Sequence, residues 1–173
     1  MLSTIKLAFK FLDINALTML YKSFVLPILD YCCVAWCPFY VKDIDSLERV
    51  QRRFTRMLPV YRHLPYEERL QKYGITTLYA RRFKFDLVCM YKIVHGLIDI
   101  PRDHLFTFDF VSRTRGHQFK VKSKCARLDI QKHWFSYRVI PFWNSLPGEC
   151  AGAASLDEFK RRLTAHMQTL QIK

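Results

Sequence analysis

The chain has 173 residues, half of them apolar, and its 28 Lys and Arg against 15 Asp and Glu give a formal charge of +13. This apolar content, with only 5 Gly and 7 Pro, excludes a disordered, collagen-like or low-complexity chain and predicts a folded core. The positive charge favours a polyanionic partner, nucleic acid before anionic lipid.

The sequence carries no signal for a membrane or for secretion. The uncharged runs at residues 23–29 and 31–41 are separated by Asp30, and no uncharged run in the sequence reaches the roughly 18 residues that span a bilayer. The first residues lack an apolar block followed by small residues. Six irregularly spaced cysteines indicate reduced thiols. We therefore expect an intracellular protein, nuclear or cytoplasmic, that is not secreted and binds no membrane.

Apolar residues at helical spacing predict two helices in the first third of the chain. Asn15 is placed to cap the first, and Pro27 should kink or interrupt it because proline lacks a backbone donor. The second helix begins between Lys42 and Asp45 and runs to about Leu58, just before a proline.

The second helix predicts a basic face. Four arginines stand at positions i, i+3, i+4 and i+7, well away from the arc that holds its apolar residues. These four residues are Arg49, Arg52, Arg53 and Arg56. Because like charges on one face repel one another, their alignment indicates a negative partner; the alternative is an ordinary solvated surface.

Two further helices follow. Pro65 and Gly74 bracket a short helix over residues 66–73, and a longer one spans about residues 77–95, closed by Gly96. Cations crowd the first turns of the longer helix, where the helix dipole disfavours them. The candidate contacts among them are Arg81 and Arg82.

Periodicity is lost over residues 97–130. Residues 118–124 allow a short strand or hairpin, a helix is expected over residues 131–140 before Pro141, and Ser155 with Glu158 forms a capping box that opens a final helix. We predict an all-α, mostly helical fold. Its parts are a helical domain (1–96), a basic connecting segment (97–130) and a C-terminal helical segment packed on the rest (131–173).

The connecting region and the residues after it are strongly basic. Between residues 111 and 138 eight Lys and Arg face a single acid, Asp129. The candidate nucleic-acid contacts here are Arg113, Arg115, Lys120, Lys122 and Lys124. Three clusters of one sign match the electrostatic pattern of nucleic-acid binding.

We find no pattern that predicts catalysis, a metal or a cofactor. The closest acidic pair, Asp43 and Asp45, is explained by helix capping, and Cys33 and Cys37 lack the second ligand pair of a zinc site. A nuclease that uses this acidic pair with His63 is the lowest-ranked alternative. Aromatic residues near the C-terminus allow base stacking; they are Trp134, Phe135, Tyr137, Phe142 and Trp143. A core is favoured instead, because the residues near helical spacing are Phe135, Val139, Phe142, Trp143 and Leu146.

Several segments resemble the C-terminal part of reverse transcriptases from non-LTR (LINE-type) retrotransposons. The matching stretches are LYKSFVLPILDY at 20–31, LERVQRRFTR at 47–56, YEERL at 66–70, RR at 81–82, MYKIVHG at 90–96, TRGH at 114–117, YRVI at 137–140 and WNSLP at 143–147. Their order and spacing cover most of the chain.

The resemblance implies that residues 1–96 are thumb-like, in a family whose thumb grips the template–primer duplex while the palm polymerises. Arg49, Arg52, Arg53 and Arg56 occupy the corresponding basic helix. The family's paired palm aspartates, its fingers and its endonuclease domain are missing from this sequence. The resemblance thus implies a non-catalytic fragment of a transposable-element polyprotein, whose parent would be an RNA-directed DNA polymerase.

The expected partner is an RNA, DNA or RNA–DNA hybrid duplex, bound through its backbone. Two alternatives stay open. One is a protein–protein interaction module, whose partner is a reverse-transcriptase palm domain or another protein. The other is a transposon relic without an independent function.

Overall fold

The computed structural model describes residues 2–8, 13–101, 105–108, 117–123 and 125–169. Within these ranges the chain is all-α, as predicted, and the only β feature is an isolated antiparallel bridge between Phe108 and Val121. The expected strand or hairpin over residues 118–124 is reduced to that bridge. No helix among the described residues is long and apolar enough to cross a membrane.

The chain divides into two compact units, residues 1–82 and 83–173. The division falls inside a long helix. The first unit contains α1 (Leu2–Ala8), α2 (Ile14–Leu20), a π-helical turn (Tyr21–Val25), α3 (Leu26–Asp30), α4 (Val41–Thr55), a 3-10 turn (Pro59–Tyr61), α5 (Tyr66–Tyr73) and the start of α6 (Leu78–Val94). The second contains the rest of α6, a 3-10 turn (Asp129–His133), α8 (Phe135–Asn144), α9 (Gly148–Ala151) and α10 (Leu156–Thr169).

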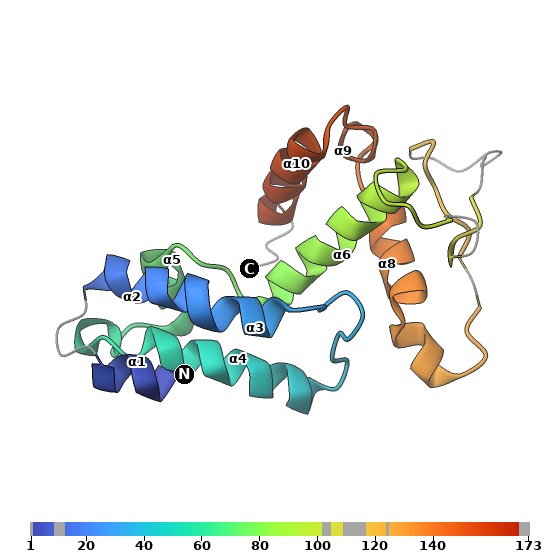
Figure 1. Cartoon of the computed structure of the whole chain (residues 1–173). Coiled ribbons are helices and arrows are strands. Elements are labelled where there is room, and N and C mark those ends of the chain that lie inside the picture. The colour runs from blue at the N-terminus through green and yellow to red at the C-terminus, as the bar shows by residue number, and fades with distance from the viewer. Residues whose placement is uncertain (1, 9–12, 102–104, 109–116, 124, 170–173) are drawn as a thin grey trace. The chain divides into compact units, whose positions relative to one another are not determined.

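The first unit is built on a pair of adjacent helical segments, α2–α3 and α4 (Figure 1). Leu17 and Tyr21 are fully buried between them, and the ring of Tyr21 stacks on Phe54 with 3.9 Å between centroids. Tyr73 of α5 and Leu78 of α6 complete this core. The core fixes α4 along its inner face and leaves its outer face to solvent.

Helix ends in the first unit follow local chemistry. The carboxylate of Asp13, rather than Asn15, caps α2 by accepting from the backbone N–H of Ala16 at 2.8 Å. The π-helical turn precedes Pro27, which sits in the first turn of α3. A wider turn ahead of the ring accommodates its missing N–H, so the predicted interruption is confirmed. Gly74 ends α5 in the left-handed conformation, at φ +58°.

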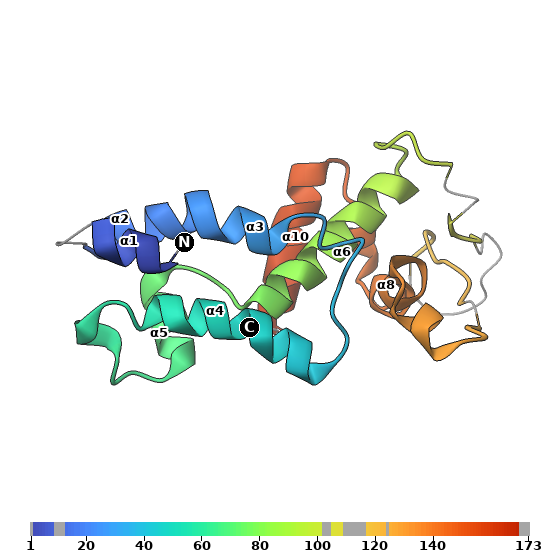
Figure 2. The same ribbon diagram turned by 60° about the horizontal axis from the view of Figure 1, so that its bottom comes forward.

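The second unit packs α8 and α10 on α6 (Figures 1 and 2). Tyr91 of α6 stacks on Phe159 of α10 at 4.3 Å, and its hydroxyl donates to the carbonyl of Ala153 at 2.7 Å. Trp143 of α8 is fully buried and lies 6.2 Å from Phe159. These aromatic side chains form a core of their own.

The sequence predicts a helix over residues 131–140, and the prediction that it ends before Pro141 was wrong. Residues 129–133 form a 3-10 turn, and α8 begins at Phe135 and continues through Pro141 to Asn144. Pro141 is exposed, so its ring points to solvent while Ile140 and Trp143 anchor the helix in the core. Burial of the flanking residues outweighs the lost hydrogen bond.

Candidate nucleic-acid interface

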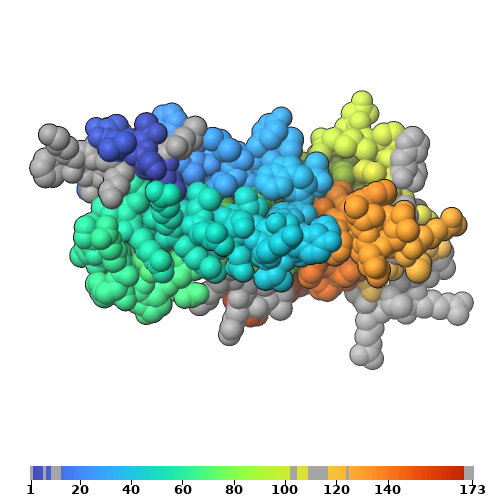
Figure 3. Space-filling view, turned by 90° about the horizontal axis from the view of Figure 1, so that it is seen from below, coloured from blue at the N-terminus to red at the C-terminus, as the bar shows by residue number. Residues whose placement is uncertain are grey.

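Helix α4 has two chemically different faces. Its buried residues are Glu48, Gln51, Phe54 and Thr55. The side chains of Arg49, Arg52, Arg53 and Arg56 are all exposed on the opposite face. All four arginines are exposed, as their spacing predicts, while the side chain of Arg53 turns to Ser3 of α1 and that of Arg52 lies over Tyr66 of α5. Figure 3 shows α4, in cyan, at the surface of the first unit.

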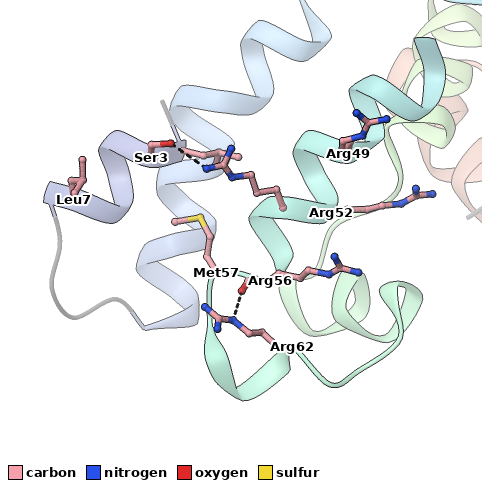
Figure 4. Close-up of a pocket in the computed structure, with 9 residues that line it drawn as sticks. Ser3, Leu7, Arg49, Arg52, Arg56, Met57 and Arg62 are labelled. Atoms are coloured by element: carbon pink, nitrogen blue, oxygen red, sulfur yellow. Dashed lines mark hydrogen bonds between the residues drawn. The ribbon is translucent and has the colours of Figure 1, made fainter. Parts of the chain in front are cut away.

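A groove of about 860 Å³ runs between this face and α1. In Figure 4, Arg49, Arg52 and Arg56 extend from the side of α4 that faces away from α1, and Ser3 and Leu7 lie on α1. Arg53 is the α4 arginine that reaches α1, where it donates to Ser3. The lining residues are Leu2, Ser3, Leu7, Arg49, Arg52, Arg53, Arg56, Met57 and Arg62. Five guanidinium groups and no carboxylate line this groove, which gives it a strongly positive potential.

The groove arginines have few protein partners. Arg52 lies 3.8 Å from Asp45, with about half of each side chain in solvent, a pairing that contributes little. Arg53 donates to the hydroxyl of Ser3 at 3.4 Å, and Arg62 folds back to donate to the carbonyl of Arg56 at 3.0 Å. None of these contacts neutralises the cluster, so its donors remain available to an anion.

A buried polar network lies under the arginine face. The side chain of Gln51 accepts from Tyr21 at 2.9 Å and donates to the carbonyl of Thr76 at 2.9 Å and to Tyr66 at 3.0 Å. Glu48 accepts from the Tyr66 hydroxyl, from Gln51 and from the backbone N–H of Leu78 at 3.0 Å. The carboxylate thus sits at the N-terminus of α6, where negative charge is favoured.

Burial and then the hydrogen bond to Glu48 raise the pKa of Tyr66, so the phenol stays protonated and donates. Burial also raises the pKa of Tyr21, ahead of the charge of Glu48. The network therefore keeps its protons across the physiological range and holds α4 to α5 and α6 as one rigid base for the arginines.

Arg69 is a basic residue that serves the fold. It is buried, donates to the hydroxyl of Thr55 at 3.1 Å and also bonds the carbonyl of Leu64. Burial, and then the nearby charge of Arg56, lowers the pKa of Arg69. Its side chain joins α5 to the end of α4.

Arg81 and Arg82, predicted as phosphate contacts, bond within the first unit instead. Arg81 binds the carboxylate of Asp30 through two nitrogens, at 2.6 and 3.1 Å. Arg82 is buried, donates to the carbonyl of Leu29 at 2.8 Å and lies over the ring of Trp36 at 4.9 Å. Both hold the end of α3 and the following loop to α6, and we leave them out of the interface.

The remaining predicted contacts belong to the second unit. Lys122 is exposed, and its backbone N–H donates to the carbonyl of Thr107 at 2.8 Å, while Lys120 is half-buried. Arg113, Arg115 and Lys124 lie outside the described residues. Among the described residues of the first unit, the α4 set lines a shared groove.

Other candidate chemistry was tested against the described side chains. No three of their His, Cys, Asp or Glu groups come together in an arrangement that could hold a metal ion. Of the C-terminal aromatics, Trp143 is fully buried as the core interpretation expects, while Trp134 and Phe142 are largely exposed. Of the helically spaced set, Val139, Trp143 and Leu146 are buried and Phe142 is exposed, so the core interpretation holds for part of it.

Sequence reasoning missed Arg62 and the α1 wall of the groove. Arg62 follows the 3-10 turn Pro59–Tyr61, so helical periodicity does not extend to it. Leu7 on α1 is 84% exposed, and a pattern that searches for buried apolar residues assigns it no role. Of the residues that line the groove, the sequence indicated only the four arginines of α4, through their helical spacing.

Comparison with known proteins found no matching family model, no matching curated protein and no matching solved structure.

Proposed function

We propose that the first unit is a non-catalytic nucleic-acid-binding module that holds the backbone of an RNA, DNA or hybrid duplex in the α4 groove. The observation that carries the proposal is the set of four exposed arginines of α4 that line one groove together with Arg62 and with no carboxylate among the described lining residues. The predicted resemblance to a reverse-transcriptase thumb supports the same reading and stays a prediction.

The geometry suits consecutive phosphates of one strand. Arg49 and Arg56 are seven residues apart, which is about 10 Å along an α-helix. Phosphates of one strand advance about 3.4 Å along the duplex axis, so the row spans about three such steps, which join four phosphates. Guanidinium forks bind phosphate oxygens in pairs, which makes arginine better suited than lysine to this contact. Such contacts fix position and read no sequence.

The test is the salt dependence of duplex binding. Replacing Arg49, Arg52, Arg53 and Arg56 together with Gln should weaken binding and flatten the log–log salt slope by about 3 to 4, at about 0.9 per phosphate on B-DNA. Fluorescence anisotropy with a short duplex at several salt concentrations measures both quantities.

A charge-matched variant controls for the net charge of the whole chain. Lys22, Lys42 and Lys72 are exposed cations of the first unit that do not line the groove, and Arg161 is an exposed cation of the second. Changing these four to Gln removes the same four charges. We expect this variant to keep most of the slope. Equal slopes for the two quadruple variants would show that the charge is read diffusely and that α4 forms no interface.

A protein partner is the second candidate, and exposed apolar side chains favour it. Met19, Phe24, Ile28 and Tyr31, on α2–α3 and the turns joined to it, are each more than half exposed. Size-exclusion chromatography with light scattering separates the two functions. A salt-insensitive oligomer without affinity for duplex would support protein binding.

A further inference from the structure

Tyr66 lies directly beneath one of the groove arginines. Its ring centroid is 5.4 Å from the guanidinium carbon of Arg52 and 5.6 Å from that of Arg69. Both guanidinium groups are within the range of a cation–π contact. Arg69 is buried, whereas about half of the Arg52 side chain is in solvent.

The ring itself is held in place by its hydroxyl. The Tyr66 hydroxyl donates to Glu48 and accepts from the side-chain amide of Gln51 at 3.0 Å. Two groups of α4 therefore fix the orientation of a ring that belongs to α5. A guanidinium that lies over such a ring keeps its N–H edges free to donate to a phosphate.

We infer that Tyr66 is a positioning residue for Arg52: it orders this arginine along the groove before nucleic acid binds, which lowers the entropy lost on binding. The inference rests on the proposed function of the groove. Of the four α4 arginines, Arg52 carries an aromatic stack, and Arg49 has none with the rings that the structure describes. Arg49 is therefore the matched reference.

A double-mutant cycle on duplex affinity tests the inference. Tyr66→Leu removes the ring. It is introduced into three backgrounds: the unmodified chain first, Arg52→Gln second and Arg49→Gln third. We expect about two- to fivefold weaker binding in the first and third backgrounds and no further loss after Arg52→Gln. Tyr66→Phe keeps the ring and should keep the affinity, although it loses the hydroxyl bonds and lowers the melting temperature.

Equal losses from Tyr66→Leu in all three backgrounds would overturn the inference and show a general structural role. If Tyr66→Leu fails to fold, Arg52→Lys takes its place, with Arg49→Lys as its matched control. Both keep the charge and lose the guanidinium fork, and Arg52→Lys also loses the planar stack, so it should bind about two- to fivefold more weakly than Arg49→Lys. Equal binding by these two variants would also overturn the inference.

A measurement without nucleic acid separates this inference from the proposed function. The Nε–Hε proton of Arg52 should show a ring-current shift in the NMR spectrum of the free protein, kept in Tyr66→Phe and absent in Tyr66→Leu. If the unmodified protein shows the shift but the quadruple arginine variant binds duplex as tightly as the unmodified protein, the proposed function is wrong and the positioning role stands. Absence of the shift in the unmodified chain would remove the positioning role alone.

Discussion

His117 is a buried side chain of the second unit in which one ring nitrogen is satisfied and the other is not. Its Nε2 lies 3.0 Å from the carbonyl oxygen of Trp143, and its Nδ1 is buried without a partner. A carbonyl oxygen only accepts, so Nε2 carries the proton and Nδ1 is bare. Protonation would therefore add a charge and an unpaired N–H inside the core.

This geometry predicts that acid weakens the second unit. Burial lowers the pKa of His117 below its ordinary value of 6.5. Below pH 6.5 the unfolded chain then binds more protons than the folded one, so stability is full above 6.5 and is lost as the pH falls toward the folded-state value. Melting temperatures at pH 7.5 and 5.5 measure the loss. His117→Gln should reduce the difference, whereas His63→Gln, at an exposed position, should not; equal behaviour of the two variants would contradict the prediction.

Residue-level reading of the sequence found the arginine row but not the side chains that support it. Helical spacing is a local property, so Arg49, Arg52, Arg53 and Arg56 were predictable from periodicity. Glu48 and Gln51 are polar, and only the arrival of α5 and α6 shows that they are buried and bonded. Their burial is decided by tertiary contacts, which a periodicity argument does not contain.

At the scale of elements, the ends of helices were readable where one residue supplies the chemistry. Gly74 and Gly96 both adopt positive φ, at +58° and +66°, and close α5 and α6 as predicted. The hydroxyl of Ser155 caps α10 by accepting from the N–H of Glu158 at 3.2 Å. The prediction that a helix ends before Pro141 was wrong. The sequence shows the cost of a proline inside a helix, but it does not show that the neighbouring residues are buried and stabilise the helix.

Gly74 allows the conformational cost of a helix end to be measured. A Cβ at this position would meet no atom within 4 Å, so only the left-handed backbone opposes a side chain. We expect Gly74→Ala to destabilise the first unit by about 1 to 2 kcal/mol, and Gly74→Asn by less, since Asn tolerates this conformation. Gly148→Ala serves as a control, because φ is negative there and the new Cβ would lie 3.8 Å from that of His117. Denaturant titrations give these differences; equal costs for Ala at both glycines would refute the argument.

At the scale of the whole molecule, each unit has its own core and its own buried polar contact that joins its helices. In the first, Glu48 joins α4 to Tyr66 and Leu78. In the second, Arg138 binds the carboxylate of Asp86 through two nitrogens at 2.8 and 2.9 Å, and burial raises the pKa of Asp86 against the opposing effect of that pair. The sequence did not show where one core ends and the next begins, because α6 supplies apolar residues to both without a break in its pattern.

Two core variants should therefore unfold different halves of the chain. Glu48→Ala leaves the Tyr66 hydroxyl and the Leu78 N–H without an acceptor, at about 1 to 3 kcal/mol each. Arg138→Met leaves the Asp86 carboxylate buried and unpaired, at about 3 to 5 kcal/mol. Hydrogen exchange followed by mass spectrometry should show lost protection in peptides within residues 13–82 for the first variant and within 83–169 for the second. Loss of protection across both ranges in either variant would contradict this prediction. It would mean that the two cores unfold together as one cooperative structure.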